Sequence, residues 1–390
     1  MAIENLIQNL KDESSEELGL ALNEARGLVK KYVVLEGEEY FDALTLWIAS
    51  TYAQEAFQYF PRVVFSSPDK QCGKTTALTI VEFLVEKPQR TSSISVSALF
   101  RTIEAKRDEG VVLLMDEIDS TFSKNGDKER GEATRQIINE GFIKNGVVHR
   151  TEGKNFVVKE FRVACPIVMA GIGKTASPET IRDRSLIFPM RRVLPNERLG
   201  LGRLRHKWAE LEFAPVRERL ANALKPMRKE FEKASDLVEF PEGLSPRQED
   251  VWENLLAVAY VVGGEWRERA LRASLKLCDT ALEPVAVGRE VEALSLCKDV
   301  FEEIEEDRIS ATDLVSKINA LEHSPYKDHS YPLNAKRLAN LLDEYGIRSV
   351  NQGKTRNYHR KDFEKSWAIY LLEPVLSVKP VSDALDGLDT

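Results

Sequence analysis

The chain has 390 residues, of which 43% are hydrophobic and 30% are charged, and its formal net charge is −8. This length suggests two or three domains, and the composition fits a soluble globular protein with a sizeable core. The negative charge argues against a generally basic nucleic-acid-binding coat, although it allows a local basic surface. No apolar run approaches the ~18 residues of a membrane span and the amino terminus is polar, so we expect a cytoplasmic protein with no membrane partner.

Residues 1–58 are predicted to form a helical amino-terminal segment. Apolar residues recur at helical spacing over Glu16–Tyr32 and over Glu39–Phe57, and Gly37 separates the two runs. The second run contains Trp47 and many Leu and Ala residues. We therefore expect it to pack against the domain that follows.

Residues 59–195 alternate between strand and helix patterns. The predicted strands are Arg62–Ser66, Gly110–Met115, Ala164–Ala170 and Ser185–Arg191, with a short one near Ser92–Ile94. The predicted helices are Lys74–Val85, Val96–Lys106, Glu129–Asn145 and Pro178–Asp183. This alternation predicts an α/β fold with a mostly parallel sheet and helices on both faces. Ligands of such sheets bind at the carboxyl ends of the strands.

The first of these strands leads into a candidate phosphate-binding loop, which ends in Gly73-Lys74-Thr75 at the start of an apolar helix. In such a loop the backbone N–H groups attract an anion, the lysine reaches the terminal phosphates and the threonine holds Mg²⁺. Pro68 replaces the usual first glycine, so an ordinary strand-to-helix turn is the alternative. The loop residues expected to bind nucleotide are Ser67, Asp69, Lys70, Gln71, Cys72, Gly73, Lys74, Thr75 and Thr76.

A second motif is the apolar run Val111–Met115, which stops on Asp116 and Glu117. A buried strand would carry these acids to the edge of the sheet beside the phosphate loop. There Asp116 would bind Mg²⁺ through water, and Glu117 would polarise the attacking water as the catalytic base. The alternative is a core strand followed by a solvated acidic helix start. Together the two motifs, in this order, predict binding of ATP and Mg²⁺.

Residues 146–161 interrupt the alternation and read as a β-hairpin, because two β-branched runs flank the turn Glu-Gly-Lys-Asn. One hypothesis is that Lys154 at the tip, with Arg150 or His149, contacts a nucleic-acid backbone. The alternative is a surface hairpin whose charges are solvated.

Arg182 and Arg184 lie at the junction of a short helix and the last strand. The guanidinium group is planar and permanently charged, and it suits phosphate. Arg184, or failing that Arg182, could therefore act as an arginine finger for a neighbouring subunit. The alternative is an internal ion pair with Asp183.

Residues 196–284 read as a helical lid, with helices over Leu199–Leu224 and Met227–Ser235. Ser245 and Pro246 suit the cap and first position of a further helix. Arg247 would then lie in its first turn, where it could reach back to the γ-phosphate. Surface pairing with Glu249 or Asp250 is the alternative.

Residues 285–372 are predicted to form a winged-helix domain, because three helix patterns precede a strand, a glycine turn and a strand. Local basic residues could bind phosphates, and the candidates are Lys336, Arg337, Lys354, Arg356 and Arg360. A winged helix used for protein contacts is the alternative. Residues 373–390 read as a loose tail.

These motifs together resemble a known family. The segments that carry the resemblance are Tyr32–Leu35, Ala43–Ala49, Ser66–Thr75, Ser97–Arg101, Leu114–Asp119, Met169–Lys174, Arg182–Ser185, Arg247–Trp252 and Tyr358–Phe363. The chain resembles a helicase-like P-loop ATPase domain, formally of unknown function, that is carried by plasmids, prophages and other bacterial mobile elements. Within that family Pro68 is ordinary. The strand ending at Gly173 offers no clear sensor residue beyond Lys174 or Thr175.

The resemblance implies an AAA+ type ATPase that forms a homo-oligomeric ring, a hexamer, and acts on single-stranded or duplex DNA in replication of a mobile element. It also implies a primase-polymerase as a partner, and a hairpin that points into the ring channel. Two other functions stay open: a nucleotide-controlled regulatory or defence switch, and a replication initiator or loader that binds DNA without unwinding it.

Overall fold

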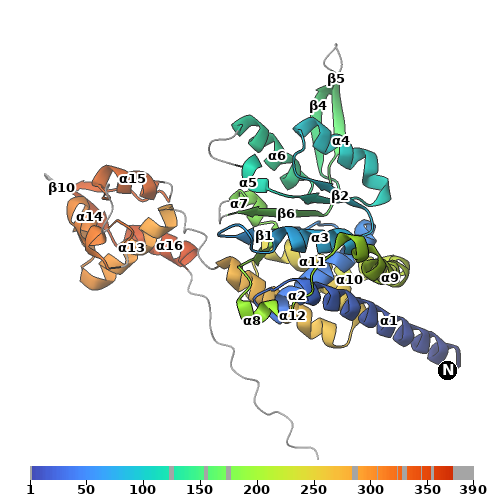
Figure 1. The fold of residues 1–390 in the computed structure, drawn as a ribbon. Coiled ribbons are helices and arrows are strands. Elements are labelled where there is room, and N and C mark those ends of the chain that lie inside the picture. Colours follow the sequence, from blue (N-terminus) through green and yellow to red (C-terminus); the bar gives the residue numbers. More distant parts are fainter. Residues whose placement is uncertain are drawn as a thin grey trace, which may run out of the picture. The chain divides into compact units, whose positions relative to one another are not determined.

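The computed structural model describes residues 2–122, 127–152, 157–172, 177–282, 289–304, 306–322, 324–326, 332–343, 345–352 and 355–371. The chain divides into two compact units, Met1–Glu283 and Pro284–Thr390 (Figure 1). This division lies next to the boundary that the sequence predicts between residues 284 and 285. No helix among the described residues combines the length and the apolar character needed to cross a bilayer.

The first unit is built on a five-stranded sheet in the order β2-β3-β6-β1-β7. The strands are β1 (Arg62–Ser67), β2 (Pro88–Thr91), β3 (Val112–Met115), β6 (Ile167–Ile172) and β7 (Ser185–Pro189). Every neighbouring pair is parallel, which confirms the predicted α/β fold. One detail differs from the prediction, because β6 lies between β1 and β3. The phosphate loop and the acidic motif therefore follow strands that are not adjacent.

Helices cover both faces of this sheet. They are α3 (Lys74–Leu84), α4 (Val96–Lys106), α5 (Ile118–Thr121), α6 (Lys128–Glu140) and α7 (Glu179–Arg182), and a short 3₁₀ turn, η2, spans Arg107–Glu109. Successive residues of a strand point to opposite faces. Accordingly Val63 and Phe65 belong to the core on the α3 face, whereas Val64 belongs to the core on the α4 face. The inner strands β1, β3 and β6 are thus buried on both sides, as parallel strands are.

Strand β2 lies a few residues earlier than the predicted strand near Ser92–Ile94. It begins at Pro88, which has no N–H to donate to a neighbouring strand. Pro is tolerated here because β2 is the edge strand and Pro88 is its first residue. Residue propensity does not predict this strand, because Pro is disfavoured in strands. Its place at the start of an edge strand is what allows Pro88 here.

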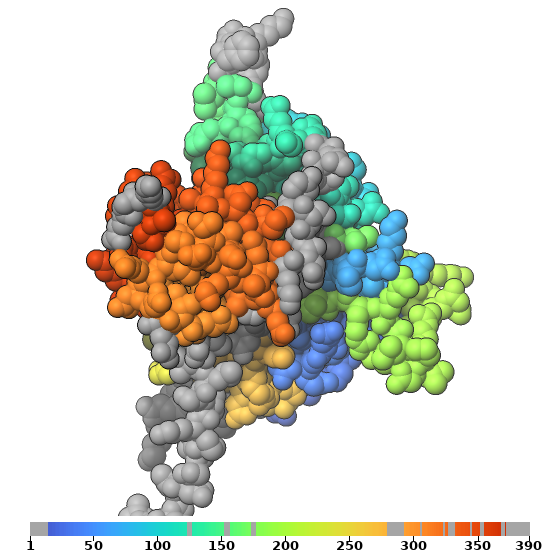
Figure 2. Space-filling model, turned by 90° about the vertical axis from the view of Figure 1, so that its left-hand side faces the viewer, coloured from blue at the N-terminus to red at the C-terminus, as the bar shows by residue number. Residues whose placement is uncertain are grey.

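The hairpin consists of β4 (Val147–Glu152) and β5 (Val157–Arg162), paired antiparallel as predicted. It rises from the sheet unit (Figures 1 and 2). Its predicted tip residue Lys154 lies outside the described residues. Near the tip Val157 and Val158 are 62% and 64% exposed.

The remaining helices of the first unit surround the α3 face. They are α1 (Ala2–Tyr32), α2 (Glu38–Ser50), α8 (Pro195–Arg198), α9 (His206–Leu224), α10 (Arg228–Ser235), α11 (Pro246–Val262) and α12 (Glu265–Leu282), with 3₁₀ turns η1 (Thr51–Ala56) and η3 (Lys225–Met227). Their buried side chains share one core with α3 and β1. The helices of residues 196–282 therefore belong to the same compact unit as the sheet, and their action as a lid stays a prediction.

Helix α9 begins at His206 and not at Leu199 as predicted. The segment before it is held by a contact far away in sequence, in which the Gly202 N–H donates to the Lys31 carbonyl oxygen at 2.7 Å. A Cβ atom on Gly202 would lie 2.8 Å from the Tyr32 ring. Glycine is needed at this close approach, and the segment stays extended against the end of α1.

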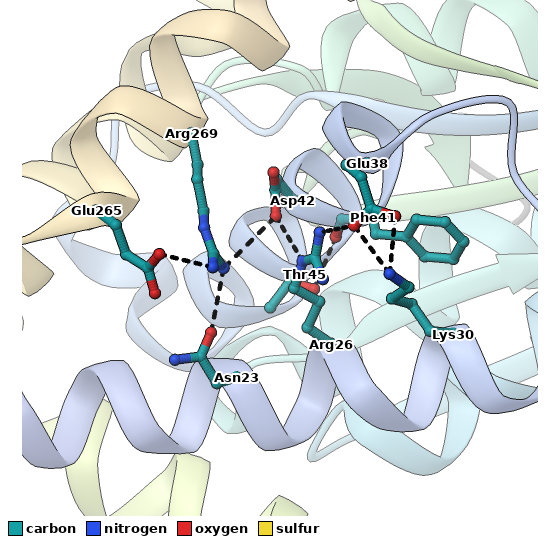
Figure 3. A network of polar contacts seen from close by, with 9 residues as sticks. All are labelled: Asn23, Arg26, Lys30, Glu38, Phe41, Asp42, Thr45, Glu265 and Arg269. Atoms are coloured by element: carbon teal, nitrogen blue, oxygen red, sulfur yellow. Dashed lines mark hydrogen bonds and ion pairs between the residues drawn. The ribbon is translucent and has the colours of Figure 1, made fainter.

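A polar network fixes α1, α2 and α12 to one another (Figure 3). Asp42 is 4% exposed and accepts from Arg26 at 2.6 Å, and Arg269 of α12 lies 3.9 Å away. Arg26 and Lys30 also pair with the exposed Glu38. The buried carboxylate therefore neutralises cations from two helices that are far apart in sequence.

The second unit combines α13 (Arg289–Ile304), β8 (Arg308–Ser310), α14 (Ala311–Ala320), α15 (Ala335–Asp343), β9 (Val350–Gln352), β10 (Thr355–His359) and α16 (Lys361–Tyr370). The three strands form an antiparallel sheet in the order β8-β10-β9. The rings of Phe301, Phe363 and Trp367 pack against one another in the core of this unit. The sequence predicts the first three helices and the last two strands, but it does not predict β8 or α16.

Candidate functional site

The loop between β1 and α3 contains left-handed backbone conformations that residues other than glycine rarely adopt. Gln71 has φ 61° and Gly73 has φ 82°, so two left-handed residues lie within three positions. Gly73 is the residue immediately before helix α3, which begins at Lys74. Left-handed turns of this kind make consecutive N–H groups converge, and such concavities bind anions. The first turn of α3 adds its own unpaired N–H groups and its dipole.

Lys74 folds its side chain back over this loop. Its Nζ donates to Ser67 Oγ and to the Asp69 carbonyl oxygen, the latter at 3.1 Å. Ser67 Oγ in turn donates to the same carbonyl oxygen at 2.6 Å. Asp69 also forms an ion pair with Arg192 at 2.5 Å. These bonds hold the Lys74 ammonium group inside the loop. It lies beside the backbone N–H groups whose direction is set by the left-handed residues Gln71 and Gly73.

A cleft of about 660 Å³ opens at this loop, in the ~300–1,000 Å³ range of small-ligand sites. Its cationic lining consists of Lys74, Arg191, Arg192, Arg198 and Arg203. Its apolar lining includes Tyr32, Val33, Val34, Met190, Leu201 and Leu204. No acidic residue lines it among the described part of the chain. We name this space the loop cleft.

The predicted loop residues take different places around the loop cleft. The residues that line it are Gln71, Cys72, Gly73, Lys74, Thr75 and Thr76. Ser67 and Asp69 lie behind Lys74 as its hydrogen-bond partners. Lys70 is exposed, and Cys72 is 3% exposed with its Sγ close to the Lys70 carbonyl oxygen.

The sequence does not predict the wall made by residues 32–34 and 198–204. Tyr32–Leu35 belongs to the resemblance but carries no predicted role in a site, and the two segments are joined by the bond between Gly202 and Lys31 across the fold. The one local signal is Gly202 itself, since glycine often marks a close approach of two backbones. A cleft lined by both apolar and cationic side chains suits a ligand that carries both an aromatic ring and phosphate groups.

Asp116 lies directly after β3, at the carboxyl edge of the sheet. Its Oδ2 pairs with Arg90 Nη2 at 2.9 Å, and Arg90 Nη1 donates to Glu82 and Thr79 of α3. Thr79 Oγ1 donates to the Thr75 carbonyl oxygen at 2.8 Å. Arg90 therefore joins the acidic motif to the helix that follows the phosphate loop. The sequence does not predict this role for Arg90.

Glu117 is exposed and has φ 55°. Among the described residues, Gln71 and Glu117 are the two non-glycine residues with positive φ. Each such residue costs roughly 1–3 kcal/mol, and strain of this kind concentrates at functional sites. Gln71 lies in the segment that the sequence predicts as the phosphate loop, and Glu117 lies in the predicted acidic motif.

The metal-binding prediction rests on Thr75 and Asp116. Within the described residues no cluster of three or more His, Cys, Asp or Glu side chains could hold a metal ion. Mg²⁺ commonly takes one or two protein oxygen ligands and completes its shell with phosphate oxygens and water. A hydroxyl and a carboxylate are of the right kind for that ion, provided that a phosphate is bound at the same time.

Arg184 and Arg247 lie at the other edge of the sheet. The Arg184 carbonyl oxygen accepts from Arg62 N, which is the first residue of β1, while the phosphate loop follows its last residue. At ~3.3 Å per residue the strand separates these edges by roughly 17 Å. Arg247 pairs with Asp250 at 2.9 Å and does not line the loop cleft. The pair with Asp250 is the surface pairing that the sequence offered as the alternative, and contact of Arg247 with a γ-phosphate stays a prediction.

Arg182 ends α7 and is partly buried, and burial lowers its pKa. The Arg184 pKa is also lowered, by burial and by the nearby Arg247 cation. Arg184 Nη1 donates to the Thr180 carbonyl oxygen at 2.7 Å. No ion pair with Asp183 is found for Arg184 in the part of the chain that the structure describes, so its guanidinium faces main-chain oxygen.

The predicted nucleic-acid contacts are dispersed. Lys154 and Lys354 lie outside the described residues. Lys336 and Arg356 are exposed on the second unit, and Arg337 lies 5.5 Å from the Tyr326 ring centroid. Arg360 Nη1 donates to the Phe301 carbonyl oxygen at 3.2 Å, so its side chain helps to hold α13.

Comparison with known proteins adds two similarities. Residues 189–370 match the sequence profile of the family described as "Protein of unknown function (DUF3631)". The chain is also 29% identical, over 187 residues, to a Saccharopolyspora erythraea protein described as "Uncharacterized 28.9 kDa protein in xis 5'region". That alignment covers 46% of this chain and 68% of the relative.

Proposed function

We propose that this protein is an AAA+ type ATPase that couples ATP hydrolysis to movement along, or remodelling of, DNA in a mobile genetic element. The observation that carries the proposal is the position of Lys74, held inside a left-handed loop at the mouth of the loop cleft. A lysine ammonium surrounded by converging N–H groups is suited to a polyphosphate.

The loop cleft supports a nucleotide as the ligand. Its phosphate groups would lie against Lys74 and the loop N–H groups, and its base against the apolar side of Val33, Val34 and Leu201. The additional cations Arg191 and Arg203 fit the charge of a triphosphate. A nucleotide placed in this way contacts both the cationic and the apolar lining of the cleft.

The acidic motif supports hydrolysis. Mg²⁺ bound to Thr75 and Asp116 would neutralise charge on the phosphates. Glu117 would orient the attacking water and accept its proton. Its strained backbone holds the residue at the end of β3, where its exposed carboxylate can meet solvent.

The position of Arg184 supports a ring of subunits. Because Arg184 lies at the edge opposite the loop cleft of its own chain, it would reach a phosphate only in a neighbouring subunit. A finger supplied in trans stabilises the charge of the transition state. We therefore infer a homo-oligomer, with a hexamer as the expected form.

Several features support DNA as the substrate. The hairpin carries Arg150 and exposed apolar residues near its tip. The second unit has helices and an antiparallel sheet in the order expected of a winged helix, with Lys336 and Arg356 exposed. The similar S. erythraea protein is described as lying in the xis 5' region, which supports the proposed mobile-element setting. The primase-polymerase partner stays a prediction.

The ATPase rate of the purified protein tests this proposal, measured with Mg²⁺ alone, with single-stranded DNA and with duplex DNA. We expect hydrolysis that DNA stimulates, and loss of hydrolysis in Lys74→Ala. A protein that neither binds nor hydrolyses ATP would refute the proposal. Arg107→Gln is a matched control, because Arg107 is a surface cation paired with Asp108 away from the loop cleft.

One observation favours a nucleotide-controlled switch as the second candidate. The Asp116 carboxylate is already paired with Arg90, which would compete with Mg²⁺ for it. In a switch, ATP would bind tightly and turn over slowly, and its presence would change partner binding. ATP binding without stimulation by any DNA would favour this function over the motor.

A further inference from the structure

A second cleft lies at the base of the β4–β5 hairpin, with a volume of about 620 Å³. Three separate segments line it: the turn before α4 with the first turns of that helix, the start of α6, and strand β4. Figure 1 shows the hairpin rising beside α4. The lining residues are Ser93, Ser95, Val96, Ser97, Phe100, Arg101, Arg130, Arg150 and Thr151, and we name this space the arginine cleft.

The arginine cleft is strongly cationic. Arg101, Arg130 and Arg150 line it, and none of its described lining residues is acidic. Arg130 Nη2 donates to the Ile94 carbonyl oxygen at 2.9 Å, and Arg150 Nη1 donates to the His149 carbonyl oxygen at 2.8 Å. Because these bonds use main-chain oxygen and not carboxylate, they orient the side chains without cancelling their charge.

An aromatic wall holds two of the cations side by side. The Phe100 ring centroid lies 5.0 Å from Arg101 Cζ and 5.7 Å from Arg150 Cζ. Phe100 is only 3% exposed and packs on Phe161 at 4.5 Å between centroids. Cation–π attraction to this ring therefore places two guanidinium groups on one wall of the arginine cleft.

Neutral donors complete the arginine cleft. Helix α4 begins at Val96, and Ser95 caps it by accepting from Ala98 N at 3.2 Å. The N–H groups of the first helical turn have no partner within the helix, and this end of the helix carries partial positive charge. The hydroxyls of Ser93, Ser97 and Thr151 line the same space. Proteins usually contact backbone phosphates with arginine side chains together with hydroxyls and backbone N–H groups.

We propose that the arginine cleft binds the phosphodiester backbone of single-stranded nucleic acid. Guanidinium groups bind phosphate oxygens in a bidentate manner, and three of them suit successive phosphates. A space of small-ligand size admits one backbone but not a duplex. The inference rests on the proposed function, since it identifies the strand along which the ATPase would act, and it adds Arg101 and Arg130 to the predicted Arg150.

Fluorescence anisotropy of a labelled oligothymidine, titrated with protein in the absence of nucleotide and over a range of salt concentrations, tests the inference. The variant is Arg101→Gln/Arg130→Gln/Arg150→Gln. Each lost phosphate contact lowers the salt slope of log K by about 0.7 for a single strand, so we expect the slope to fall by about 2. We also expect at least tenfold weaker binding at low salt. The corresponding triple Lys variant keeps the charges and should retain most of the affinity.

Arg107→Gln is the matched control, because Arg107 lies just beyond the opposite end of α4. The inference is overturned if the triple Gln variant binds the oligonucleotide with the wild-type salt slope. It is also overturned if a duplex binds as tightly as the oligonucleotide and loses this affinity in the triple Gln variant. Competition by inorganic phosphate at low concentration, which would indicate a small-anion site, overturns it as well. Thermal denaturation of each variant verifies that it is folded.

The test separates failure of this inference from failure of the proposed function. Oligonucleotide binding is measured without ATP, so it does not depend on the loop cleft. If the wild-type protein hydrolyses ATP but the triple Gln variant binds the oligonucleotide normally, the inference alone fails. If the wild-type protein does not bind ATP yet the triple variant loses the oligonucleotide, the ATPase proposal fails and the arginine cleft stands.

Discussion

Arg184 and Arg247 direct their guanidinium groups to the same aromatic ring. Their Cζ atoms lie 5.9 and 5.5 Å from the Phe142 centroid, although the residues come from the start of β7 and the first turn of α11. Arginine stays protonated in proteins, so the two cations repel each other, and this proximity contributes to the lowered pKa of Arg184. A phosphate brought by a neighbouring subunit would relieve the repulsion.

The first prediction concerns Arg184→Ala. If Arg184 completes the site of the adjacent subunit, the variant should assemble and bind ATP normally but hydrolyse it roughly 10³-fold more slowly. Turnover of ATP and binding of a fluorescent ATP analogue measure the two effects separately. Arg107→Gln again controls for the loss of one surface arginine. Normal turnover in Arg184→Ala would exclude the finger role.

A mixing experiment tests whether Arg184 acts between subunits. Arg184→Ala and Glu117→Gln should each be inactive alone. In a mixture, some interfaces pair an intact Glu117 with an intact Arg184 from the neighbour, so part of the activity should return. No recovery at any mixing ratio, despite mixed oligomers by light scattering, would mean that Arg184 does not act in trans.

The second prediction concerns Glu117→Gln. Removing a general base typically slows a reaction by about 10²–10⁴-fold, while the uncharged amide keeps the size of the side chain. We expect the variant to retain ATP binding and lose hydrolysis by that factor. Glu109→Gln, which changes an exposed carboxylate before β3, provides the control. Equal turnover in wild type and Glu117→Gln would assign the base elsewhere.

Much of the first unit could be predicted because its signals are local. Apolar runs identify the predicted strands Arg62–Ser66 and Gly110–Met115, and β1 and β3 lie there, with β1 ending one residue later. The apolar wall of the loop cleft could not be predicted, because Val33 and Leu201 meet only through tertiary contacts. The same limit explains Arg247. Ser245 and Pro246 fix where α11 starts, but the packing of α11 against α2, α10 and α12 decides where Arg247 lies.

The third prediction concerns the stability of the first unit. Asp42→Asn removes the buried carboxylate that neutralises Arg26 and lies near Arg269. Arg26 keeps Glu38 as a partner, so the expected cost is that of losing a buried hydrogen bond between charged groups, about 1.5–3 kcal/mol. Glu38→Gln changes an exposed carboxylate that pairs with the same Arg26, and it should cost less than about 1 kcal/mol. Urea denaturation of the two variants measures this difference, and equal effects would contradict the role of Asp42.

The fourth prediction concerns pH. Burial, with Asp250 and Asp236 nearby, raises the pKa of Glu253 in α11 to about 7. The folded state then binds this proton more tightly than the unfolded chain, whose ordinary value is 4.5. Stability should therefore fall as pH rises from below 5 to above 7, because folding must bury an ionised carboxylate at the higher pH.

Glu253→Gln removes this term. The variant should melt at a higher temperature than wild type at pH 8, and the difference should shrink as the pH falls toward 5. Glu242→Gln, on the exposed turn before α11, controls for the loss of one negative charge. A melting-temperature difference that stays constant between pH 5 and pH 8 would show that Glu253 does not titrate in this range.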